Sequence, residues 1–167
     1  MGLSGVKQPE VYASVLSDLN WADLWLQLKH NVVYSDYARY ATLHPFVHCI
    51  AYGINAGGLK LHKSSYNERA SLLARGGQPE KHQNLVAALS TLPDRVQKIT
   101  GRSVPEKMNH LGMLYALLNT GIERVLIGVS SVEQLQDSFA WEQAIRVHDY
   151  QDWYQAIAEV IVQQKEV

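Results

Sequence analysis

The sequence predicts an α/β fold, namely a partial (half) TIM-type (β/α) barrel with about four parallel strands plus C-terminal helices. Short apolar runs typical of buried strands alternate with helical patterns, and this order favours a parallel sheet with crossover helices. A closed barrel of this type needs eight strands and about 250 residues. The chain has 167 residues, so we expect half of such a barrel in a single domain, residues 1–167.

The first third of the chain contains three of the expected strands. Residues 1–5 resemble the end of a strand, so we expect the chain to begin within a structural unit. A helix follows over 8–19, with proline suited to its first turn. Alternating leucines predict a strand over 23–29. A short helix over 35–42 and a second apolar strand over 46–52 complete this part.

The middle of the chain is expected to be a long loop followed by helices. Residues 53–81 are rich in Gly, Lys, Ser and Asn, with a short helix near 68–74. Residues 82–92 show a helical pattern. Pro93 is expected to start a second helical piece that ends near Gly101.

The last third begins with a capping-box pattern from Ser103 to Glu106, which predicts the start of a helix. Apolar residues at helical spacing form its predicted stripe: Val104, Met108, Leu111, Tyr115 and Leu118. A final strand is expected over 124–128. Helices are expected over 131–145 and 149–164, and the second of these carries a wide apolar face.

The composition limits which binding partners and which cellular location are expected. The net charge is −1, so the chain lacks the basic excess that nucleic-acid binding requires. No apolar run is long enough to span a membrane, and the N-terminus lacks the apolar centre of a signal peptide. The single cysteine, Cys49, lies in an apolar run and is expected to be a buried thiol. A cytoplasmic location is therefore expected.

A glycine and two hydroxyl residues stand where the last strand leads into a helix. Gly128 would let a ligand approach the backbone, and Ser130 and Ser131 would add hydroxyl donors to the free N–H groups of a helix start. That arrangement suits a phosphate. The same residues also fit a capping box, pairing Ser131 with Gln134 or Ser130 with Glu133. On the residues alone, capping is the favoured interpretation.

Other catalytic patterns are absent from the sequence. The only histidines four residues apart are His44 and His48, and Pro45 lies between them, so a zinc site is not expected. The sequence contains neither a Gly-x-Ser-x-Gly elbow nor a Gly-Lys-Ser/Thr phosphate loop. Serine-hydrolase and P-loop functions are therefore not expected.

Four segments together resemble the C-terminal part of aldo-keto reductases of the bacterial and potassium-channel β-subunit type. The most specific is IERVLIGVSSVEQLQDSF, which resembles the family's V-x-S-V-L-I-G-A-S-x-x-E-Q-L-x-E-N. AYGINAGGLKLHK resembles A-Y-S-P-L-x-x-G-L-L-T-G-K, LWLQLKHNVV resembles the strand with Q-x-x-Y-N, and MGLSG resembles I-G-V-S-N. The resemblance extends over about residues 1–147.

This resemblance implies an (α/β)₈ barrel that reduces aldehydes and ketones with NADPH. It implies that Ser4 and Gln27 hold the nicotinamide carboxamide and that Tyr52 stacks on the nicotinamide ring. The segment from Gly53 through Asn55 to Lys63 would cross the pyrophosphate. Residues implied to contact the adenosine end, including its phosphates, are Arg69, Gly128, Ser130, Gln134 and Asp137. A polar loop favours a solvated Arg69 by default, but a guanidinium at the 2′-phosphate would select NADP(H) over NAD(H).

The chain also departs from the family pattern. Gly53-Ile54-Asn55 replaces Ser-Pro-Leu, Gly5 replaces an asparagine, and Ser138 replaces another, so polar contacts are altered. The family's catalytic aspartate, tyrosine, lysine and histidine lie in the first half of the barrel. No residue of this chain is assigned these roles, so no catalytic residue is predicted.

Three interpretations remain open at this point. The chain is the NADP(H)-binding half of an aldo-keto reductase, catalytic only when a separate N-terminal half completes it. Alternatively, it is a non-catalytic half-barrel acting as a homodimeric structural or interaction protein, because two open strand edges and an uncovered inner face favour association. The third interpretation is a truncated relic. The C-terminal helix could instead fold over the exposed face and keep the chain monomeric.

Overall fold

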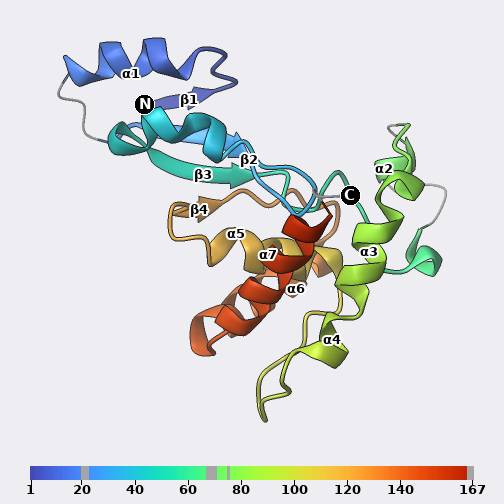
Figure 1. Ribbon diagram of the computed structural model, residues 1–167. Coiled ribbons are helices and arrows are strands. Elements are labelled where there is room, and N and C mark those ends of the chain that lie inside the picture. The colour runs from blue at the N-terminus through green and yellow to red at the C-terminus, as the bar shows by residue number, and fades with distance from the viewer. Residues whose placement is uncertain (20–22, 67–70, 75, 165–167) are drawn as a thin grey trace.

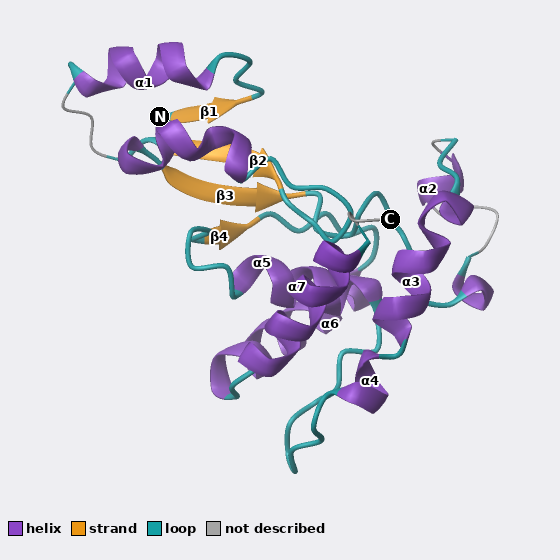
Figure 2. Cartoon of the chain, in the orientation of Figure 1, coloured by secondary structure: helices purple, strands orange, loops and turns teal. Residues whose placement is uncertain are grey.

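The chain folds into a parallel sheet with helices packed mainly against one of its faces (Figures 1 and 2). A computed structural model describes residues 1–19, 23–66, 71–74 and 76–164. The strands are β1 (Gly2–Ser4), β2 (Trp25–Lys29), β3 (His48–Tyr52) and β4 (Arg124–Val125). The α-helices are α1 (Pro9–Ser17), α2 (Ser71–Ala74), α3 (Gln83–Ser90), α4 (Leu92–Arg95), α5 (Met108–Leu117), α6 (Val132–Val147) and α7 (Gln151–Gln163). The 3₁₀ helices are η1 (Ala38–Phe46), η2 (Lys63–Ser65) and η3 (Pro79–His82).

Within the described residues the strand order is β1-β2-β3-β4, and every neighbouring pair is parallel. Parallel neighbours in sequence order, joined by crossovers with helices, are the arrangement of a (β/α) barrel. The prediction of a half-barrel with four parallel strands is therefore confirmed. The sheet ends at β1 on one side and at β4 on the other.

The two faces of the sheet differ in their cover. Leu26 and Leu28 on β2 and Cys49 and Ala51 on β3 are buried beneath the helices. Alternate residues point to the opposite face of a strand. The residues at those alternate positions that are exposed are Gln27, Lys29, Tyr52 and Arg124. The face that would line a closed barrel is thus open to solvent.

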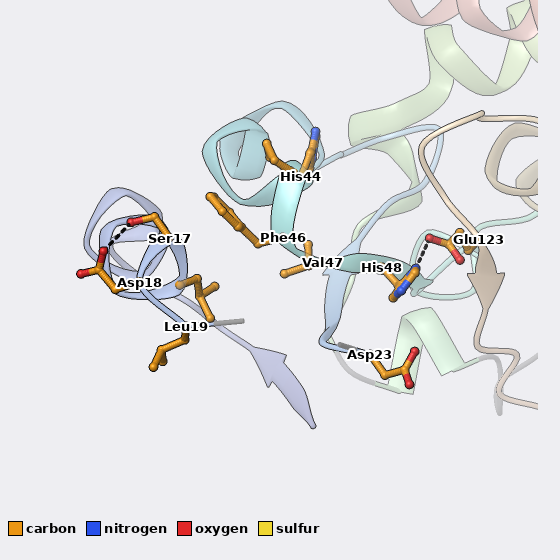
Figure 3. Close-up of a pocket in the computed structure, with 11 residues that line it drawn as sticks. Ser17, Asp18, Leu19, Asp23, His44, Phe46, Val47, His48 and Glu123 are labelled. Atoms are coloured by element: carbon orange, nitrogen blue, oxygen red, sulfur yellow. Dashed lines mark hydrogen bonds and ion pairs between the residues drawn. The ribbon is translucent and has the colours of Figure 1, made fainter. Parts of the chain in front are cut away.

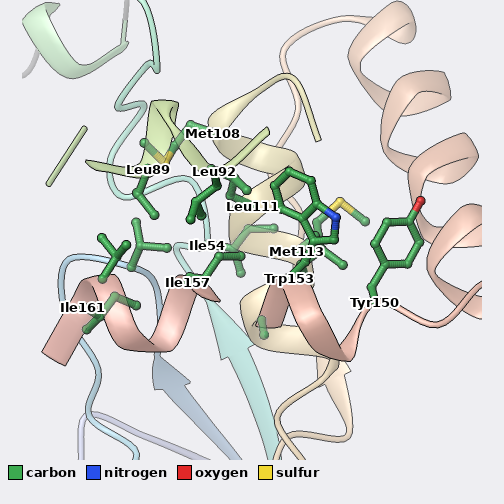
Figure 4. Packing of buried hydrophobic residues seen from close by; sticks show 14 of the residues in the cluster. Ile54, Leu89, Leu92, Met108, Leu111, Met113, Tyr150, Trp153, Ile157 and Ile161 are labelled. Carbon is green, nitrogen blue, oxygen red and sulfur yellow. The ribbon is translucent and has the colours of Figure 1, made fainter. Parts of the chain in front are cut away.

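Two clusters of apolar side chains hold the helices in place. The smaller joins α1 and η1 to β2 through residues such as Leu16, Leu26 and Leu43. The larger joins the loop after β3 to α3, α4, α5 and α7. Figure 4 shows Trp153 and Ile157 of α7 directed toward the side chains of the neighbouring helices. Helix α7 therefore packs on α3, α4 and α5.

Several predicted elements differ from those observed. The capping box at 103–106 is wrong, because α5 starts at Met108 and its N-cap, Lys107, makes no side-chain capping bond. The preceding segment is held instead by tertiary contacts, since Tyr150 Oη donates to the Ser103 carbonyl at 2.8 Å. Strand β4 is shorter than the predicted 124–128, although Leu126 N still donates to the Ala51 carbonyl at 2.8 Å.

Helix α5 does not have the predicted one-sided stripe. Val104 precedes the helix, and His110, Gly112 and Ala116 are buried as well as Leu111. The helix is enclosed between α6, α7 and β4. A helix covered on several sides needs small and apolar residues around its circumference, so periodicity alone understates its burial.

Candidate functional site

Three of the predicted site residues lie on one face of the sheet. Ser4 and Tyr52 end β1 and β3, and Gln27 lies in the middle of β2. Ser4 lies opposite Gln27 in the register of β1 and β2. Tyr52 lies opposite Lys29, two residues beyond Ile50, which is the β3 residue opposite Gln27. Ser4 and Gln27 are exposed, and Tyr52 is 39% exposed. The hydroxyl, amide and ring are therefore accessible to one ligand lying across three strands.

Gly53 turns the chain away from the sheet immediately after Tyr52. Its φ of +69° lies in the left-handed region, where a side chain would be strained. The buried amide of Asn31 donates to the Gly53 carbonyl at 2.9 Å. The Asn31 Oδ1 accepts from the backbone N–H groups of Val33 and Tyr34 at 3.0 and 2.9 Å. Asn31 thus joins the end of β2 to the start of the loop after β3.

The segment predicted to cross a pyrophosphate is a tight turn. Ala56 N donates to the Gly53 carbonyl, and Leu59 N donates to the Asn55 carbonyl. Asn55 Oδ1 is buried and has no hydrogen-bond partner. Lys63 begins η2 and is exposed. Arg69, the predicted 2′-phosphate ligand, lies outside the described residues.

The turn before α6 has the geometry of a helix cap. Ser131 is the N-cap, and its Oγ accepts from Gln134 N at 3.3 Å. Ser130 donates to Gln134 Oε1 from both its N–H (3.0 Å) and its Oγ (3.1 Å). The capping interpretation with Ser131 and Gln134 is therefore confirmed. A phosphate at this turn would have to displace the Gln134 side chain from Ser130.

Gly128 is exposed, and a Cβ built at this position meets no atom within 4 Å. Its backbone is outside the positive-φ conformations that favour glycine. Neither strain nor packing within the described protein therefore requires glycine here. Close approach of a ligand remains a physical reason for its presence.

Asp137 lies on the side of α6 that faces α5. It accepts from Lys107 Nζ at 2.6 Å and lies 3.1 Å from His110 Nε2 and 3.4 Å from Asn109 Nδ2. Burial alone would raise the pKa of Asp137, but these neighbours together hold the pKa below its ordinary value. The Asp137 carboxylate thus stabilises the packing of α6 on α5, a contact that the resemblance does not imply.

Lys29 is a candidate that the resemblance does not include. It lies opposite Tyr52 in the sheet register, and its side chain passes 3.7 Å from the position of a Cβ on Gly53. The ammonium lies 5.4 Å from the centre of the Tyr34 ring. Its two-residue spacing from Gln27 places it on the same face, so strand alternation could have identified it. It supplies positive charge beside the Tyr52–Gly53 turn.

The residues predicted to hold the nicotinamide are exposed together at this edge. An exposed aromatic ring, an amide, a hydroxyl and a lysine are grouped there, and the unpaired Asn55 Oδ1 lies in the adjacent turn. Of the residues predicted to contact the adenosine end, Gln134 and Asp137 already have partners within the protein. Within the described residues, no group of three His, Cys, Asp or Glu side chains is arranged to hold a metal ion.

An open hollow of about 920 Å³ lies at the opposite end of the sheet. Figure 3 shows His48 and Glu123 paired there, with Asp23 nearby. The His48 Nδ1 lies 2.6 Å from Glu123 Oε1. In (β/α) barrels the amino ends of the strands serve stability, whereas ligands bind at the carboxyl ends. We therefore assign no ligand to this hollow.

Comparison with known proteins supports the fold. No protein-family model matches the sequence, and no curated protein matches it in sequence. No helix within the described residues is long and apolar enough to cross a membrane. The structure is similar to the holo form of the aldo-keto reductase AKR11C1 from Bacillus halodurans, with a TM-score of 0.58 and 18% sequence identity. The similarity covers 95% of this chain and 49% of that enzyme. The chain therefore has the fold of about half of an aldo-keto reductase barrel.

Proposed function

We propose that this chain is the NADP(H)-binding half of an aldo-keto reductase-type oxidoreductase. Reduction of an aldehyde or ketone carbonyl would then require a separate half that supplies the acid–base residues. The observation that carries the proposal is the alignment of Ser4, Gln27 and Tyr52 on one exposed face of adjacent parallel strands, with Ser4 and Tyr52 at the carboxyl ends of β1 and β3. Ligands bind at this end of the strands in related barrels.

The side chains at this edge suit a nicotinamide. The Ser4 hydroxyl and the Gln27 amide offer both donors and acceptors for a carboxamide. The exposed ring of Tyr52 offers a flat apolar surface for an aromatic ring. NADPH bound here would supply hydride to a carbonyl carbon. The contribution of this chain would be to orient the nicotinamide and cover one of its faces.

Phosphate binding would depend on the loops. Lys29 and Lys63 are exposed cations on the sheet edge and in the loop after β3. Gly128 leaves open space beside the amino end of α6, where free N–H groups attract anions. We propose Ser130, Gln134 and Asp137 as neighbours of the adenosine end and Arg69 as the ligand of the 2′-phosphate. Asn55 belongs to the proposed pyrophosphate segment.

A second candidate function is a non-catalytic half-barrel that acts through association. The observation that favours it is the open sheet, whose order ends at β1 and β4 and whose inner face exposes Gln27 and Lys29. Unpaired strand edges invite pairing with another chain. A homodimer or a complementary half-barrel would cover these edges.

Titration with NADPH and with NADH, followed by nucleotide fluorescence, tests the first proposal. We expect binding of NADPH in preference to NADH, weakened at least tenfold by Ser4→Ala or Tyr52→Leu. Ser90→Ala is the matched control, because Ser90 lies on α3 and its hydroxyl donates to the Ala87 carbonyl of its own helix. Arg69→Ala should remove the preference for NADPH. Absence of binding at millimolar concentrations of either nucleotide would contradict the proposal.

A further inference from the structure

The turn after β1 is held by two side chains of η1. Val6 and Lys7 lie between β1 and α1, outside both elements. The Arg39 guanidinium donates from Nη2 to the Val6 carbonyl at 3.2 Å and to the Lys7 carbonyl at 3.4 Å. The Tyr40 hydroxyl donates to the same Val6 carbonyl at 3.3 Å. Two neighbouring side chains of a distant segment therefore fix one short stretch of backbone.

Val6 is the point at which this turn is anchored. Val6 is 4% exposed and Tyr40 3% exposed, and both belong to the apolar cluster that α1 and η1 share. A backbone carbonyl in such surroundings needs partners within the protein. The bond from the Arg39 guanidinium is charge-assisted, so it is stronger than a bond between neutral groups. Arg39 Cζ also lies 5.5 Å from the centre of the Tyr40 ring, which is within cation–π range.

Arg39 is itself connected to the end of β2. Asp36 N donates to the Lys29 carbonyl at 2.8 Å. The Asp36 Oδ1 accepts from the Tyr34 hydroxyl at 2.8 Å and lies 3.8 Å from Arg39 Nη1. A chain of contacts therefore runs from the last residue of β2 through Asp36 and Arg39 to the Val6 carbonyl.

The two ends of this chain of contacts lie equally far from the residues proposed to hold the nicotinamide carboxamide. Val6 comes two residues after Ser4, and Lys29 comes two residues after Gln27. Ser4 and Gln27 are partners in the register of β1 and β2. Between Ser4 and Val6, Gly5 has a φ of +62°, and a Cβ built on it would meet no atom within 4 Å. Because glycine has the widest backbone freedom, the direction in which the chain leaves Ser4 depends on what holds it at Val6.

We infer that Arg39 is a positioning residue for the nucleotide site. Through the Val6 carbonyl it fixes the turn after β1, and thereby the place of the Ser4 hydroxyl relative to the Gln27 amide. Tyr40 supports the same carbonyl with its second hydrogen bond. The inference rests on the proposed function, in which Ser4 is a ligand of the carboxamide. Arg39 acts through Ser4, and a small displacement of a positioned group is enough to weaken its interaction with a ligand.

A double-mutant cycle in NADPH binding tests this role. Arg39→Met removes the hydrogen bonds but keeps a long side chain, and it should weaken NADPH binding at least fivefold. Ser4→Ala should weaken binding less than threefold in the Arg39→Met background, against at least tenfold in the wild type, because a displaced hydroxyl contributes little. Tyr52→Leu should keep its full effect in the same background, since Asn31 ties the loop after Tyr52 independently of Arg39.

Arg146→Met is the matched control for the loss of one cation. Arg146 is an exposed arginine of α6 that pairs with Glu142 of its own helix. The nucleotide is an anion, so any general effect of removing a positive charge should be the same in both methionine variants. Arg146→Met should therefore bind NADPH like the wild type and leave the effect of Ser4→Ala at tenfold or more.

A second measurement needs no nucleotide. Lys7 is exposed and lies in the anchored turn, so a protease that cleaves only after lysine reports how often the turn opens. Cleavage between Lys7 and Gln8 should be at least fivefold faster in Arg39→Met and in Tyr40→Phe than in the wild type. Lys98, in the exposed segment between α4 and α5, is the internal reference. The rate of cleavage after Lys98 should be the same in all three proteins.

Unchanged cleavage after Lys7 in both variants would overturn the inference, because the turn would then not depend on η1. An undiminished effect of Ser4→Ala in the Arg39→Met background would also overturn it, while NADPH binding by the wild type would leave the proposed function standing. A wild type that binds neither nucleotide would contradict the proposed function, and cleavage after Lys7 would then decide alone whether Arg39 holds the turn. Circular dichroism verifies that each variant is folded.

Discussion

The amide of Asn31 and the carbonyl of Gly53 form a 2.9 Å hydrogen bond that ties the end of β2 to the loop after β3. Gly53 follows Tyr52 directly, so this bond sets the direction in which the chain leaves the proposed nicotinamide surface. Asn31 is buried, and its Oδ1 accepts two backbone N–H groups. Its three hydrogen bonds thus shape two loops at the carboxyl edge.

Asn31→Asp should separate the two functions of this side chain. The aspartate keeps the acceptor for Val33 and Tyr34 but loses the donor to Gly53 and places a carboxylate against its carbonyl. We expect a loss of about 1–3 kcal/mol in the free energy of unfolding, together with weaker NADPH binding. Urea denaturation and nucleotide titration measure the two effects. An unchanged midpoint of unfolding would show that the Asn31–Gly53 bond contributes nothing to stability.

Gly112→Ala should destabilise the protein, although alanine normally favours a helix by about 1 kcal/mol over glycine. A Cβ at this position of α5 would lie 2.3 Å from the Ile54 carbonyl oxygen, a backbone atom that cannot rotate away. Relieving the clash would displace the turn that contains Asn55. We expect a net loss of about 1–3 kcal/mol in unfolding free energy.

Gly128→Ala is the matched control for that substitution. Its Cβ would enter open space, so the unfolding free energy should change by less than about 0.5 kcal/mol. If a phosphate approaches the backbone here, the same substitution should weaken NADPH binding. A stable Gly112→Ala protein, with a midpoint equal to or above that of the wild type, would show that α5 and the Ile54 turn are not in rigid contact.

The strands were predictable because their signal is local. Alternating leucines identified β2, and the run ending at Tyr52 identified β3, so the half-barrel followed from their order. The start of α5 was harder to predict, because the segment before it is held by the Tyr150 hydroxyl on the Ser103 carbonyl, a contact between residues far apart in sequence. Sequence patterns do not contain such contacts, and local capping chemistry alone gave the wrong boundary.

The candidate site depended on the family resemblance. That resemblance alone named Ser4, Gln27 and Tyr52, and the register of the strands places them on one face, while their roles stay predictions. Asp137 was expected near a nucleotide, but its partners Lys107 and His110 come from another helix and could not be foreseen from its own motif.

Arg102→Met should be among the more destabilising single substitutions. The Arg102 guanidinium donates to both Asp152 carboxylate oxygens at 2.8 and 2.7 Å and to the carbonyls of Asp149 and Gln97 at 2.8 Å. Its side chain is only 4% exposed. Breaking a buried pair costs about 3–5 kcal/mol; because Asp152 is 39% exposed, we expect about 2–3 kcal/mol here.

Arg102→Lys distinguishes geometry from charge. Lysine keeps the positive charge but lacks the planar fork that binds a carboxylate through two nitrogens. It should therefore recover less than half of the stability lost in Arg102→Met, as measured by guanidinium or thermal unfolding. Equal stability of the lysine variant and the wild type would indicate that charge alone suffices.

The protein should lose stability as the pH falls from 7.5 to 5. Burial lowers the pKa of His30, His44 and His110 below the ordinary value of 6.5. The unfolded chain therefore binds more protons than the folded chain below about pH 6.5, so unfolding is favoured there. The stability is fully present above the unfolded pKa and declines as the pH drops below it. Carboxylates with lowered pKa values, such as Asp137, lose their contribution to stability only at lower pH.

His30→Phe should reduce this pH dependence. The His30 ring stacks on Tyr115 with 4.6 Å between centroids, and its Nδ1 lies 2.7 Å from Ser35 Oγ. Phenylalanine keeps the stacking and removes the proton-binding group. Urea midpoints measured at pH 7.5, 6.5 and 5.5 should therefore fall less steeply than in the wild type, even if the variant is less stable at pH 7.5. Parallel slopes for His30→Phe and the wild type would show that protonation of His30 does not contribute to acid unfolding.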